Sequence, residues 1–250
     1  MSEICFCIPA RYKSTRLHNK LLLKFGDETC IVKTVKQVLK SKYADSENVY
    51  VLTDNTLIRD ELTSLDCNVI MTSENYCNGT ERISKNLGLV PEKYSIIVNV
   101  QADEPFISPL NIDESISKHL QNNGDIFYTT LHEENNAVDY LKSTASLKLV
   151  TDIHNNVLYY SRNIIPWNKK NEIKEGFIYK TFTGIYVFNR DYLEKYCTIK
   201  NTDLQEEEDC EQLKIIENGF TIKTYPTIDY NEISLNTAED YSYLCNKYSN

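Results

Sequence analysis

The amino-acid sequence predicts an α/β fold organised around a doubly wound, mostly parallel sheet. Short apolar runs of strand length alternate with helical patterns through the first half of the chain, and no internal repeat interrupts them. In the second half, several strand-like runs follow one another without intervening helices, which predicts an antiparallel addition to the sheet. The 250 residues suit one domain of this class rather than two independent cores.

The strands are predicted from apolar runs and the helices from amphipathic periodicity. The opening run, residues 4–8, is apolar on both faces, and Pro9 is expected to end it because proline lacks a backbone donor. Asp54 is expected to cap the helix that follows the second strand. The expected strands are 4–8, 48–52, 68–71, 96–100, 125–130, 146–150, 156–160 and 183–188, and the expected helices are 29–42, 55–64, 190–196, 204–218 and 237–247.

Composition narrows the class of protein. The formal net charge of −9 makes the chain acidic, which argues against nucleic acid as a partner. No apolar run approaches the ~20 residues that a membrane span needs, so no membrane association is expected. The 8 cysteines include no CxxC pair and the 4 histidines lie far apart, which disfavours zinc and indicates reduced thiols in a cytoplasmic protein.

The most informative stretch follows the first strand. Residues 10–20 hold Arg11, Lys13, Arg16 and Lys20 together with two hydroxyl side chains, in a chain that is acidic as a whole. A basic loop between a strand and a helix lies at the carboxyl edge of an open α/β sheet, where such folds bind phosphate. The loop has no glycine, so side-chain cations would hold phosphate together with backbone groups. A solvated basic turn is the alternative interpretation.

A second candidate site follows the strand expected at residues 96–100. Asp103 comes just past its carboxyl end, over the crevice where nucleotides bind in such sheets. Together with a polyphosphate, a carboxylate there is a natural ligand for Mg²⁺, which takes its other ligands from phosphate and water. A turn or helix-capping role before Pro109 is the alternative for Asp103, and Glu104 is interpreted as structural.

Three further segments carry weaker signals. Residues 78–82, which include Arg82, open a helix and offer free N–H groups to a ligand, although helix capping explains them as well. Arg162 lies among aromatic residues and suits the carboxylate of a small acidic substrate, or else packs at an interface. The acidic run 206–209 is interpreted as a solvated helix face.

Taken together, these segments resemble the 3-deoxy-manno-octulosonate (Kdo) cytidylyltransferases, or CMP-Kdo synthetases. The resemblance extends over nearly the whole chain, with several motifs in the family's order. It implies a fold like that of the nucleotide-diphospho-sugar transferases and a single domain over residues 1–250, with a nucleotide-binding part at about 1–130 and a sugar-binding and dimerisation part at about 131–235. The motifs are IPARYKSTRL with Lys20 (8–20), GTER (79–82), VNVQADEP (98–105), YSRNIIPW (160–167), GIY (184–186) and EQL (211–213).

The resemblance implies a reaction in which CTP and Kdo, an acidic keto-sugar, give CMP-Kdo and pyrophosphate. It also implies Mg²⁺ as cofactor, direct attack of the anomeric hydroxyl on the α-phosphate, and a homodimer. No covalent enzyme intermediate is required, because positioning and charge neutralisation carry most of such a transfer. The implied roles are catalysis by Arg11, Arg16, Lys20 and Asp103; nucleotide binding by Ala10, Arg11, Lys20, Gly79, Thr80 and Arg82; sugar binding by Gln101, Arg162, Tyr186, Glu211 and Gln212; and metal binding by Asp103 and Asn236.

Several positions depart from the family's motifs. His18 and Asn19 stand in place of a proline and a glycine, which is expected to loosen a turn, and Ala102 replaces a glycine beside the metal carboxylate. Phe182 stands where the family usually has a histidine in the sugar pocket. Asn236 stands where the family supplies a second metal-binding aspartate. Weaker metal binding or a related sugar is therefore expected more readily than loss of activity.

Two other functions fit the same residues. One is a CMP-activating enzyme for another acidic sugar, such as a sialic acid. That group usually carries a glycine-containing loop after Ala-Arg, which Tyr12-Lys13-Ser14 is not. The other is a nucleotide-binding protein without catalysis, suggested by Phe182 and Asn236 together. Activity measured with a panel of acceptor sugars distinguishes an enzyme for another acidic sugar from one for Kdo. CTP binding without product formation identifies a nucleotide-binding protein that lacks catalysis.

Overall fold

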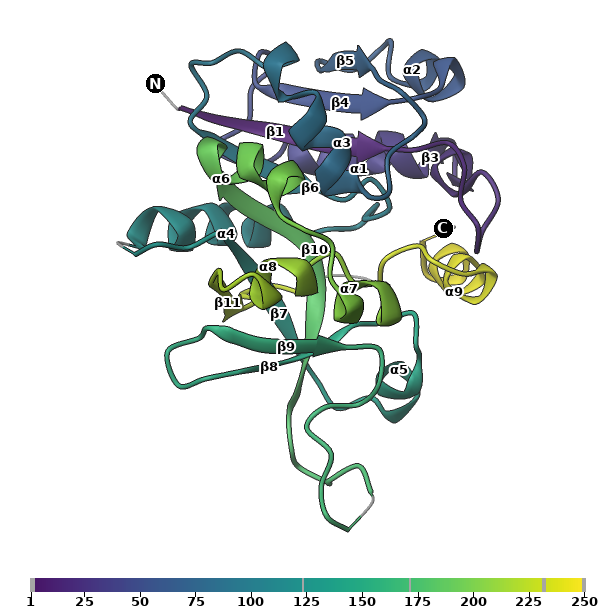
Figure 1. Ribbon diagram of the computed structural model, residues 1–250. Helices are drawn as coiled ribbons and strands as arrows, with labels where there is room; N and C mark the ends of the chain where they lie inside the picture. The colour runs from purple at the N-terminus through teal and green to yellow at the C-terminus, as the bar shows by residue number, and fades with distance from the viewer. Residues whose placement is uncertain (1–2, 123, 171, 231–232, 249–250) are drawn as a thin grey trace.

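The computed structural model of the protein describes residues 3–122, 124–170, 172–230 and 233–248, which fold as shown in Figure 1. The strands are β1 (Ile4–Ala10), β2 (Lys24–Phe25), β3 (Glu28–Thr29), β4 (Val49–Thr53), β5 (Asn68–Met71), β6 (Ile96–Val100), β7 (Tyr128–Asn135), β8 (Lys148–Thr151), β9 (Val157–Ser161), β10 (Tyr179–Asn189) and β11 (Ile222–Pro226). The α-helices are α1 (Cys30–Val38), α2 (Thr56–Glu61), α3 (Gly79–Lys85), α4 (Pro109–Gln121), α5 (Val138–Lys142), α6 (Arg190–Lys195), α7 (Asp203–Glu207), α8 (Leu213–Glu217) and α9 (Ala238–Tyr248). Short 3₁₀ turns are η1 (Lys20–Leu22), η2 (Leu87–Leu89) and η3 (Tyr196–Thr198).

The main sheet has the strand order β11-β7-β10-β6-β1-β4-β5, with β8 and β9 joined to it through β10. β1 pairs in parallel with β4 and β6, and β4 pairs in parallel with β5. β10 runs antiparallel to β6, β7 and β8, and β8 and β9 form an antiparallel pair. The predicted fold class is confirmed: the first part of the chain is parallel and the antiparallel pairing is added by the second.

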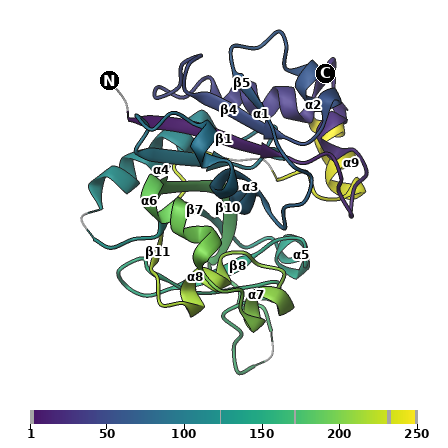
Figure 2. The ribbon, with the colours of Figure 1, turned by 45° about the horizontal axis from the view of Figure 1, so that its top comes forward.

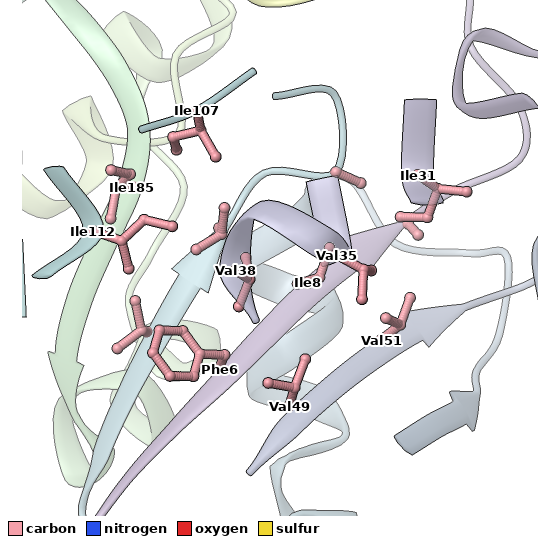
Figure 3. Close-up of a cluster of buried hydrophobic side chains, with 14 of the residues drawn as sticks. Phe6, Ile8, Ile31, Val35, Val38, Val49, Val51, Ile107, Ile112 and Ile185 are labelled. Atoms are coloured by element: carbon pink, nitrogen blue, oxygen red, sulfur yellow. The ribbon is translucent and has the colours of Figure 1, made fainter. Parts of the chain in front are cut away.

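β1 separates two apolar layers, because its side chains alternate between the faces of the sheet. Phe6 and Ile8 lie in one buried cluster with apolar side chains of α1, as Figure 3 shows, and α2 and α4 contribute to the same cluster. Cys5 and Cys7 lie in the cluster on the opposite face, with side chains of α3, α6 and α8. A strand covered on both faces explains why the opening run is apolar at successive positions.

Pro9 continues β1, so the predicted end of the first strand is wrong. The N–H of Phe6 points toward β4 and donates to the carbonyl of Asn48 at 2.8 Å. Backbone N–H groups alternate between the two edges of a strand, so the nitrogen of Pro9 points to the other edge, toward β6. The pairing of β1 with β6 ends at Cys7. The missing N–H of Pro9 therefore costs no ladder hydrogen bond, and the strand runs on to Ala10.

The cap of α2 also differs from the prediction. The side chain of Asn55 accepts the N–H of Leu57 at 2.8 Å, so Asn55 is the N-cap and Asp54 is not. Asparagine and aspartate serve equally well at this position, so the sequence alone did not decide between them. Asp54 is thereby left for contacts outside the helix.

The helix predicted over 204–218 is two short helices, α7 and α8, separated by an irregular segment. Asp209 has a left-handed backbone with φ of 43°, which a continuous right-handed helix excludes. Aspartate is one of the few residues that adopt this conformation at modest cost. Glu211 and Gln212 therefore lie between the two helices rather than within one continuous helix.

α9 brings the end of the described chain back to the loop that follows β1, as both orientations show (Figures 1 and 2). The hydroxyl of Tyr241 donates to the carbonyl of Lys24 at 2.9 Å. A capping box starts the helix: the Thr237 hydroxyl accepts the N–H of Asp240 at 3.2 Å, and the Asp240 carboxylate accepts the N–H of Thr237 at 2.8 Å. The residues just before α9 are therefore held in a defined conformation.

All 8 cysteines are free thiols. Cys5, Cys7, Cys30 and Cys210 are buried and Cys67 is half-buried. Burial raises the pKa of the Cys67 thiol to about 11 and also raises that of Cys30, which disfavours the reactive thiolate form of both side chains. Within the described ranges, none of the helices combines the length and the apolar character that a bilayer crossing requires.

Candidate active site

A cavity of about 1390 Å³ opens where the chain leaves the carboxyl ends of β1 and β6. Crevices at this edge are where open α/β sheets bind their ligands. All the site residues predicted from the sequence line this cavity except Ala10 and Thr80, whose side chains are buried. The predicted residues in the lining are Arg11, Arg16, Lys20, Gly79, Arg82, Gln101, Asp103, Arg162, Tyr186, Glu211, Gln212 and Asn236.

The basic loop and the acid after β6 meet in this cavity. Lys20 forms an ion pair with Asp103, and their side chains are only 13% and 18% exposed. Arg11 and Arg16 are exposed and line the same cavity. Their guanidinium groups make no ion pair with any of the residues that the structure describes. Two unpaired cations beside a paired cation and carboxylate have the charges that suit a polyphosphate accompanied by a divalent cation.

Asp103 lies beside Asn236, although the two are far apart in the sequence. The N–H of Leu235 donates to the carbonyl oxygen of Asp103 at 2.9 Å, and the next residue is Asn236. The N–H of Asn236 donates in turn to the Asp240 carboxylate at 2.9 Å. Both predicted metal ligands therefore line the same cavity, and the backbone segments that carry them are in contact.

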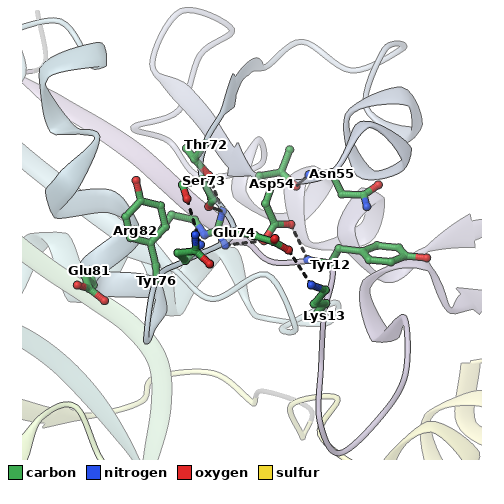
Figure 4. Close-up of polar contacts among 12 residues, drawn as sticks. Tyr12, Lys13, Asp54, Asn55, Thr72, Ser73, Glu74, Tyr76, Glu81 and Arg82 are labelled. Atoms are coloured by element: carbon green, nitrogen blue, oxygen red, sulfur yellow. Dashed lines mark hydrogen bonds and ion pairs between the residues drawn. The ribbon is translucent and has the colours of Figure 1, made fainter.

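The buried side chain of Arg82 links α3 to the segments that follow β4 and β5 (Figure 4). Its guanidinium pairs with Asp54 at 2.8 Å, and the two side chains are only 2% and 7% exposed. It also donates to the hydroxyl of Thr72 and, at 3.1 Å, to the carbonyl of Ser73. Asp54 accepts a second bond, from the N–H of Tyr12 at 2.9 Å. Arg82 and Asp54 thus tie the basic loop to α3, a role that the sequence did not reveal.

Gly79 lets the start of α3 approach the end of β1 closely. A Cβ at this position would lie 2.8 Å from Cγ of Pro9 and 3.3 Å from the side-chain amide of Gln101. The helix is capped by Asn78, whose side chain accepts the N–H of Glu81 at 2.8 Å. The helix start therefore lies at the cavity wall, where a larger residue at 79 would force the helix away.

A polar network lies behind Glu211 and Gln212, which line the cavity. The Thr80 hydroxyl donates to Glu211 at 2.9 Å and accepts from the amide of Asn99 at 3.2 Å. The amide of Gln212 donates to the Tyr186 hydroxyl at 3.0 Å. Burial raises the pKa of Glu211 to about 7. This part of the cavity wall offers hydrogen-bonding groups of the kind that recognise sugar hydroxyls.

Replacing Glu211 by glutamine is expected to stabilise the protein more at pH 8 than at pH 5. The pKa of Glu211 is about 7 in the folded protein against an ordinary value of 4.5, so the parent loses stability as pH rises through this interval. Glutamine does not titrate, and the relative gain should reach up to about 3 kcal/mol. Thermal unfolding at both pH values measures it. Glu217→Gln, on the exposed side of α8, is the control, and an equal shift at both pH values for Glu211→Gln would contradict the prediction.

Arg162 is held by backbone carbonyl groups. Its guanidinium donates to the carbonyl oxygens of Glu208 at 3.0 Å, Asp209 at 2.6 Å and Thr144 at 3.2 Å. The Glu208 carboxylate accepts the N–H of Arg162 at 2.7 Å, so the interpretation of residues 206–209 as a wholly solvated acidic face is wrong for Glu208. A substrate carboxylate would have to displace some of these carbonyl groups to bind Arg162.

The positions that depart from the family motifs have local explanations. Asn19 adopts a left-handed backbone with φ of 52°, so the turn before η1 forms without glycine. Ala102 is 4% exposed and belongs to the apolar core, and its carbonyl accepts from the Thr34 hydroxyl at 2.9 Å. Phe182 lines the cavity with its ring packed on Tyr186, at 5.3 Å between centroids. Phe182 and Tyr186 therefore form an aromatic part of the cavity wall.

Glu104 also lines the cavity and is only 7% exposed. Burial, with a smaller contribution from Asp103, raises the pKa of Glu104 to about 8. Its carboxyl group accepts from the Ser234 hydroxyl at 2.6 Å. Gly184 leaves room for it, because a Cβ there would lie 2.9 Å from Cγ of Glu104. These partners of Glu104 were not apparent from the sequence.

The chain is similar to known proteins over nearly its whole length. The family model described as cytidylyltransferase matches residues 5–224. A 3-deoxy-manno-octulosonate cytidylyltransferase of Protochlamydia amoebophila is 36% identical over 243 residues, which cover 95% of this chain and 91% of the relative. A mitochondrial 3-deoxy-manno-octulosonate cytidylyltransferase of Arabidopsis thaliana is 36% identical over 245 residues, which cover 96% of this chain and 81% of the relative.

Solved structures show the same fold. A CMP:2-keto-3-deoxy-manno-octonic acid synthetase in complex with CTP superposes with a TM-score of 0.87 at 24% identity, covering 99% of each chain. A glucose-1-phosphate thymidylyltransferase from Bacillus anthracis superposes with a TM-score of 0.66 at 14% identity, covering 98% of this chain and 95% of the other. From the family match and the relatives at 36% identity, the chain belongs to the cytidylyltransferase family, in the group of the 3-deoxy-manno-octulosonate cytidylyltransferases.

Proposed function

We propose that the protein transfers the cytidylyl group of CTP to Kdo and releases pyrophosphate. The observation that carries the proposal is the convergence of Arg11, Arg16 and the Lys20–Asp103 pair on one cavity. Three cations suit a triphosphate, and a carboxylate beside them suits a cation bound to that triphosphate. Relatives at 36% identity are named for Kdo cytidylyl transfer, which supports the choice of both substrates.

The cations would carry most of the catalysis. Arg11, Arg16 and Lys20 would bind the triphosphate of CTP and offset the negative charge that develops on the departing pyrophosphate. The anomeric oxygen of the sugar would form a bond to the α-phosphorus as the bond to the pyrophosphate oxygen breaks. This displacement places CMP on the sugar in one step and needs no nucleophile from the protein.

The residues around Asp103 fit Mg²⁺. Asp103 offers a carboxylate and Asn236 an amide oxygen, both of the hard type that Mg²⁺ binds. In the described ranges, no cluster of three His, Cys, Asp or Glu side chains is arranged to hold a metal by itself, so phosphate oxygens and water would complete the coordination. When bound, Mg²⁺ would supply polarisation of the α-phosphate and support the loss of the sugar hydroxyl proton.

The two substrates would occupy different parts of the cavity. We assign cytosine and ribose to the wall formed by β1 and α3, and the sugar acid to the wall formed by β10 and the segment before α8. With this division we propose a nucleotide-binding part at about 1–130 and a sugar-binding and dimerisation part at about 131–235, with Gln101 contributed to the sugar by the first part. The residues assigned to the nucleotide are Ala10, Arg11, Lys20, Gly79, Thr80 and Arg82, and those assigned to the sugar are Gln101, Arg162, Tyr186, Glu211 and Gln212.

The test is pyrophosphate release by the purified protein from CTP, Mg²⁺ and Kdo, with a sialic acid as a parallel acceptor. Formation of CMP-Kdo is the expected result. Product from another acidic sugar alone would move the assignment to that sugar, and the aromatic wall at Phe182 makes this comparison informative. Calorimetric binding of CTP without product at high Mg²⁺ would identify a nucleotide-binding protein that lacks catalysis.

Replacing Asn236 by aspartate is expected to lower the Mg²⁺ concentration that half-saturates activity, by about tenfold. A full negative charge attracts the cation more strongly than an amide dipole, and ~1.4 kcal/mol corresponds to tenfold. Without metal the same change should lower the melting temperature, because the new carboxylate lies beside Asp103 and Asp240. Titration of pyrophosphate release with Mg²⁺ checks the first effect. Asn236→Ala should raise the Mg²⁺ concentration that half-saturates activity. If this concentration is unchanged in both variants, residue 236 does not bind the metal.

We also propose that the protein acts as a homodimer in the cytoplasm. β8 and β9 extend below the main sheet in Figure 1, and the antiparallel pair carries the exposed side chain of Leu158, at 55%. Exposed apolar side chains on such an extension favour an interface with a second copy. Sedimentation velocity of the purified protein measures the mass directly, and a monomer at micromolar concentration would contradict this part of the proposal.

A further inference from the structure

Two consecutive residues before α9 are bonded to two consecutive residues after β6. The Ser234 hydroxyl donates to the Glu104 carboxyl group at 2.6 Å. The N–H of Leu235 donates to the Asp103 carbonyl at 2.9 Å, and the Leu235 side chain is fully buried in the core. Because the contacts occur at adjacent positions in both segments, they fix the register of one segment against the other as well as their separation.

Glu104 is itself held in place. Its side chain is 7% exposed and lies against Gly184 of β10, where a Cβ would come within 2.9 Å of Glu104 Cγ. The N–H of Gln101 donates to the Gly184 carbonyl at 2.9 Å, which keeps β10 close to the end of β6. Ser234 therefore binds a carboxyl group that has little freedom to move.

Asn236 is fixed from the other side by the start of α9. Its own N–H and that of Thr237 both donate to the Asp240 carboxylate, at 2.9 and 2.8 Å. The bond from Ser234 lies two residues before Asn236 and the contact with Asp240 lies at Asn236 itself. An amide oxygen attracts a cation only weakly, so its contribution to binding depends on accurate placement beside Asp103.

We propose that Glu104 and Ser234 are positioning residues for the divalent cation: their hydrogen bond holds Asn236 beside Asp103 so that both oxygens reach one ion. This inference rests on the proposed function, because the ion is the one that would accompany CTP. Glu104 and Ser234 do not bind the ion. They act through the backbone of residues 234–236, much as an outer hydrogen bond orients a metal ligand.

The experiment measures Mn²⁺ binding in the presence of CTP, by electron paramagnetic resonance of the free ion, together with the Mg²⁺ dependence of turnover. Ser234→Ala is expected to weaken Mn²⁺ binding about tenfold, the effect of losing one hydrogen bond to a carboxyl group. CTP binding without metal should stay at the parental value, and kcat should recover at saturating Mg²⁺. Ser234→Thr keeps the hydroxyl and should restore parental Mn²⁺ affinity.

Two further variants separate positioning from other roles. Ser41→Ala removes an equivalent serine–carboxylate bond, from Ser41 to Asp113 at 2.5 Å, that lies outside the cavity lining, and it should leave Mn²⁺ affinity unchanged. Glu104→Gln keeps an acceptor oxygen for Ser234, so parental Mn²⁺ affinity is expected. A loss in this variant would show that Glu104 binds the ion itself and would overturn the inference.

Unchanged Mn²⁺ affinity in Ser234→Ala, or equal weakening in Ser41→Ala, would also overturn the positioning role. These outcomes are distinct from failure of the proposed function. If the unaltered protein forms no CMP-sugar, the function is wrong; if it is active and Ser234→Ala binds Mn²⁺ as the parent does, only the inference fails.

Discussion

Replacing Asp103 by asparagine is expected to slow pyrophosphate release about a thousandfold at saturating CTP and Kdo. Stabilisation of charge by a bound divalent cation is worth several kcal/mol, and each ~1.4 kcal/mol changes the rate tenfold. Asparagine keeps the size of the side chain but removes the charge that pairs with Lys20 and would hold the ion. Steady-state turnover across a wide range of Mg²⁺ concentrations measures the loss. The Kd for CTP without metal should change much less than the rate, since Arg11 and Arg16 remain.

The matched control is Asp191→Asn, an exposed position on α6, which should retain parental turnover. Melting temperatures of both variants show whether the fold is intact. If Asp103→Asn folds and turns over within about tenfold of the parent, the carboxylate does not support an essential ion, because that loss would amount to only ~1.4 kcal/mol. The placement of the metal at Asp103 would then be wrong, although the cations could still bind the triphosphate.

Replacing Asp54 by asparagine is expected to destabilise the protein by about 3–5 kcal/mol, the range for breaking a buried ion pair. The Arg82 guanidinium is only 2% exposed, and the change leaves its charge buried without the carboxylate at 2.8 Å. For a chain of this size each kcal/mol lowers the melting temperature by roughly 2–4 °C. Thermal unfolding should therefore show a fall of roughly 6–20 °C. The affinity for CTP should change less than the stability, because the side-chain oxygen of the asparagine can still accept the N–H of Tyr12 in the basic loop.

Asp60→Asn is a matched control because Arg59 and Asp60 form an ion pair at 2.7 Å with side chains 46% and 56% exposed. Exposed pairs contribute about 0–1 kcal/mol, so this variant should unfold within a few degrees of the parent. If Asp54→Asn lowers the melting temperature as little as Asp60→Asn does, the buried ion pair between Arg82 and Asp54 contributes no more to stability than an exposed pair. The contacts of Asp54 with the basic loop and with Arg82 of α3 would then contribute little to the stability of the fold.

The sequence predicted the parallel part of the fold well. Four strands could be predicted from their apolar composition, because the sheet is covered on both faces. They lie around residues 4–8, 48–52, 68–71 and 96–100. The same reasoning located the basic loop and Asp103 at one edge of the sheet, since the carboxyl ends of parallel strands meet there. β11 and α5 were not predicted, because each is short and its pattern does not stand out from the surrounding polar residues.

Pro9 and the segment 204–218 depart from their local sequence patterns for the same physical reason. The local pattern predicts that Pro9 ends a strand and that residues 204–218 form one continuous helix. A local pattern contains no information about the distant segments that pack against it. Pro9 is tolerated because pairing with β6 has already ended at Cys7. The helix is interrupted at Asp209, where the adjacent Glu208 and its carbonyl bind Arg162 of another segment. Tertiary contacts outweighed local preference in both cases.

The amino-acid sequence by itself determined the class of fold, the family motifs and the kinds of side chain that meet at the cavity. Those properties follow from local patterns of apolar and charged residues, which the sequence contains directly. Only the tertiary structure decided which of these side chains face the cavity without an ion-pair partner and which also hold segments of the protein together. Arg11 and Arg16 face the cavity, whereas Arg82 is paired with Asp54 and Arg162 is held by carbonyl groups. All four are arginines, and only contacts between distant segments distinguish them.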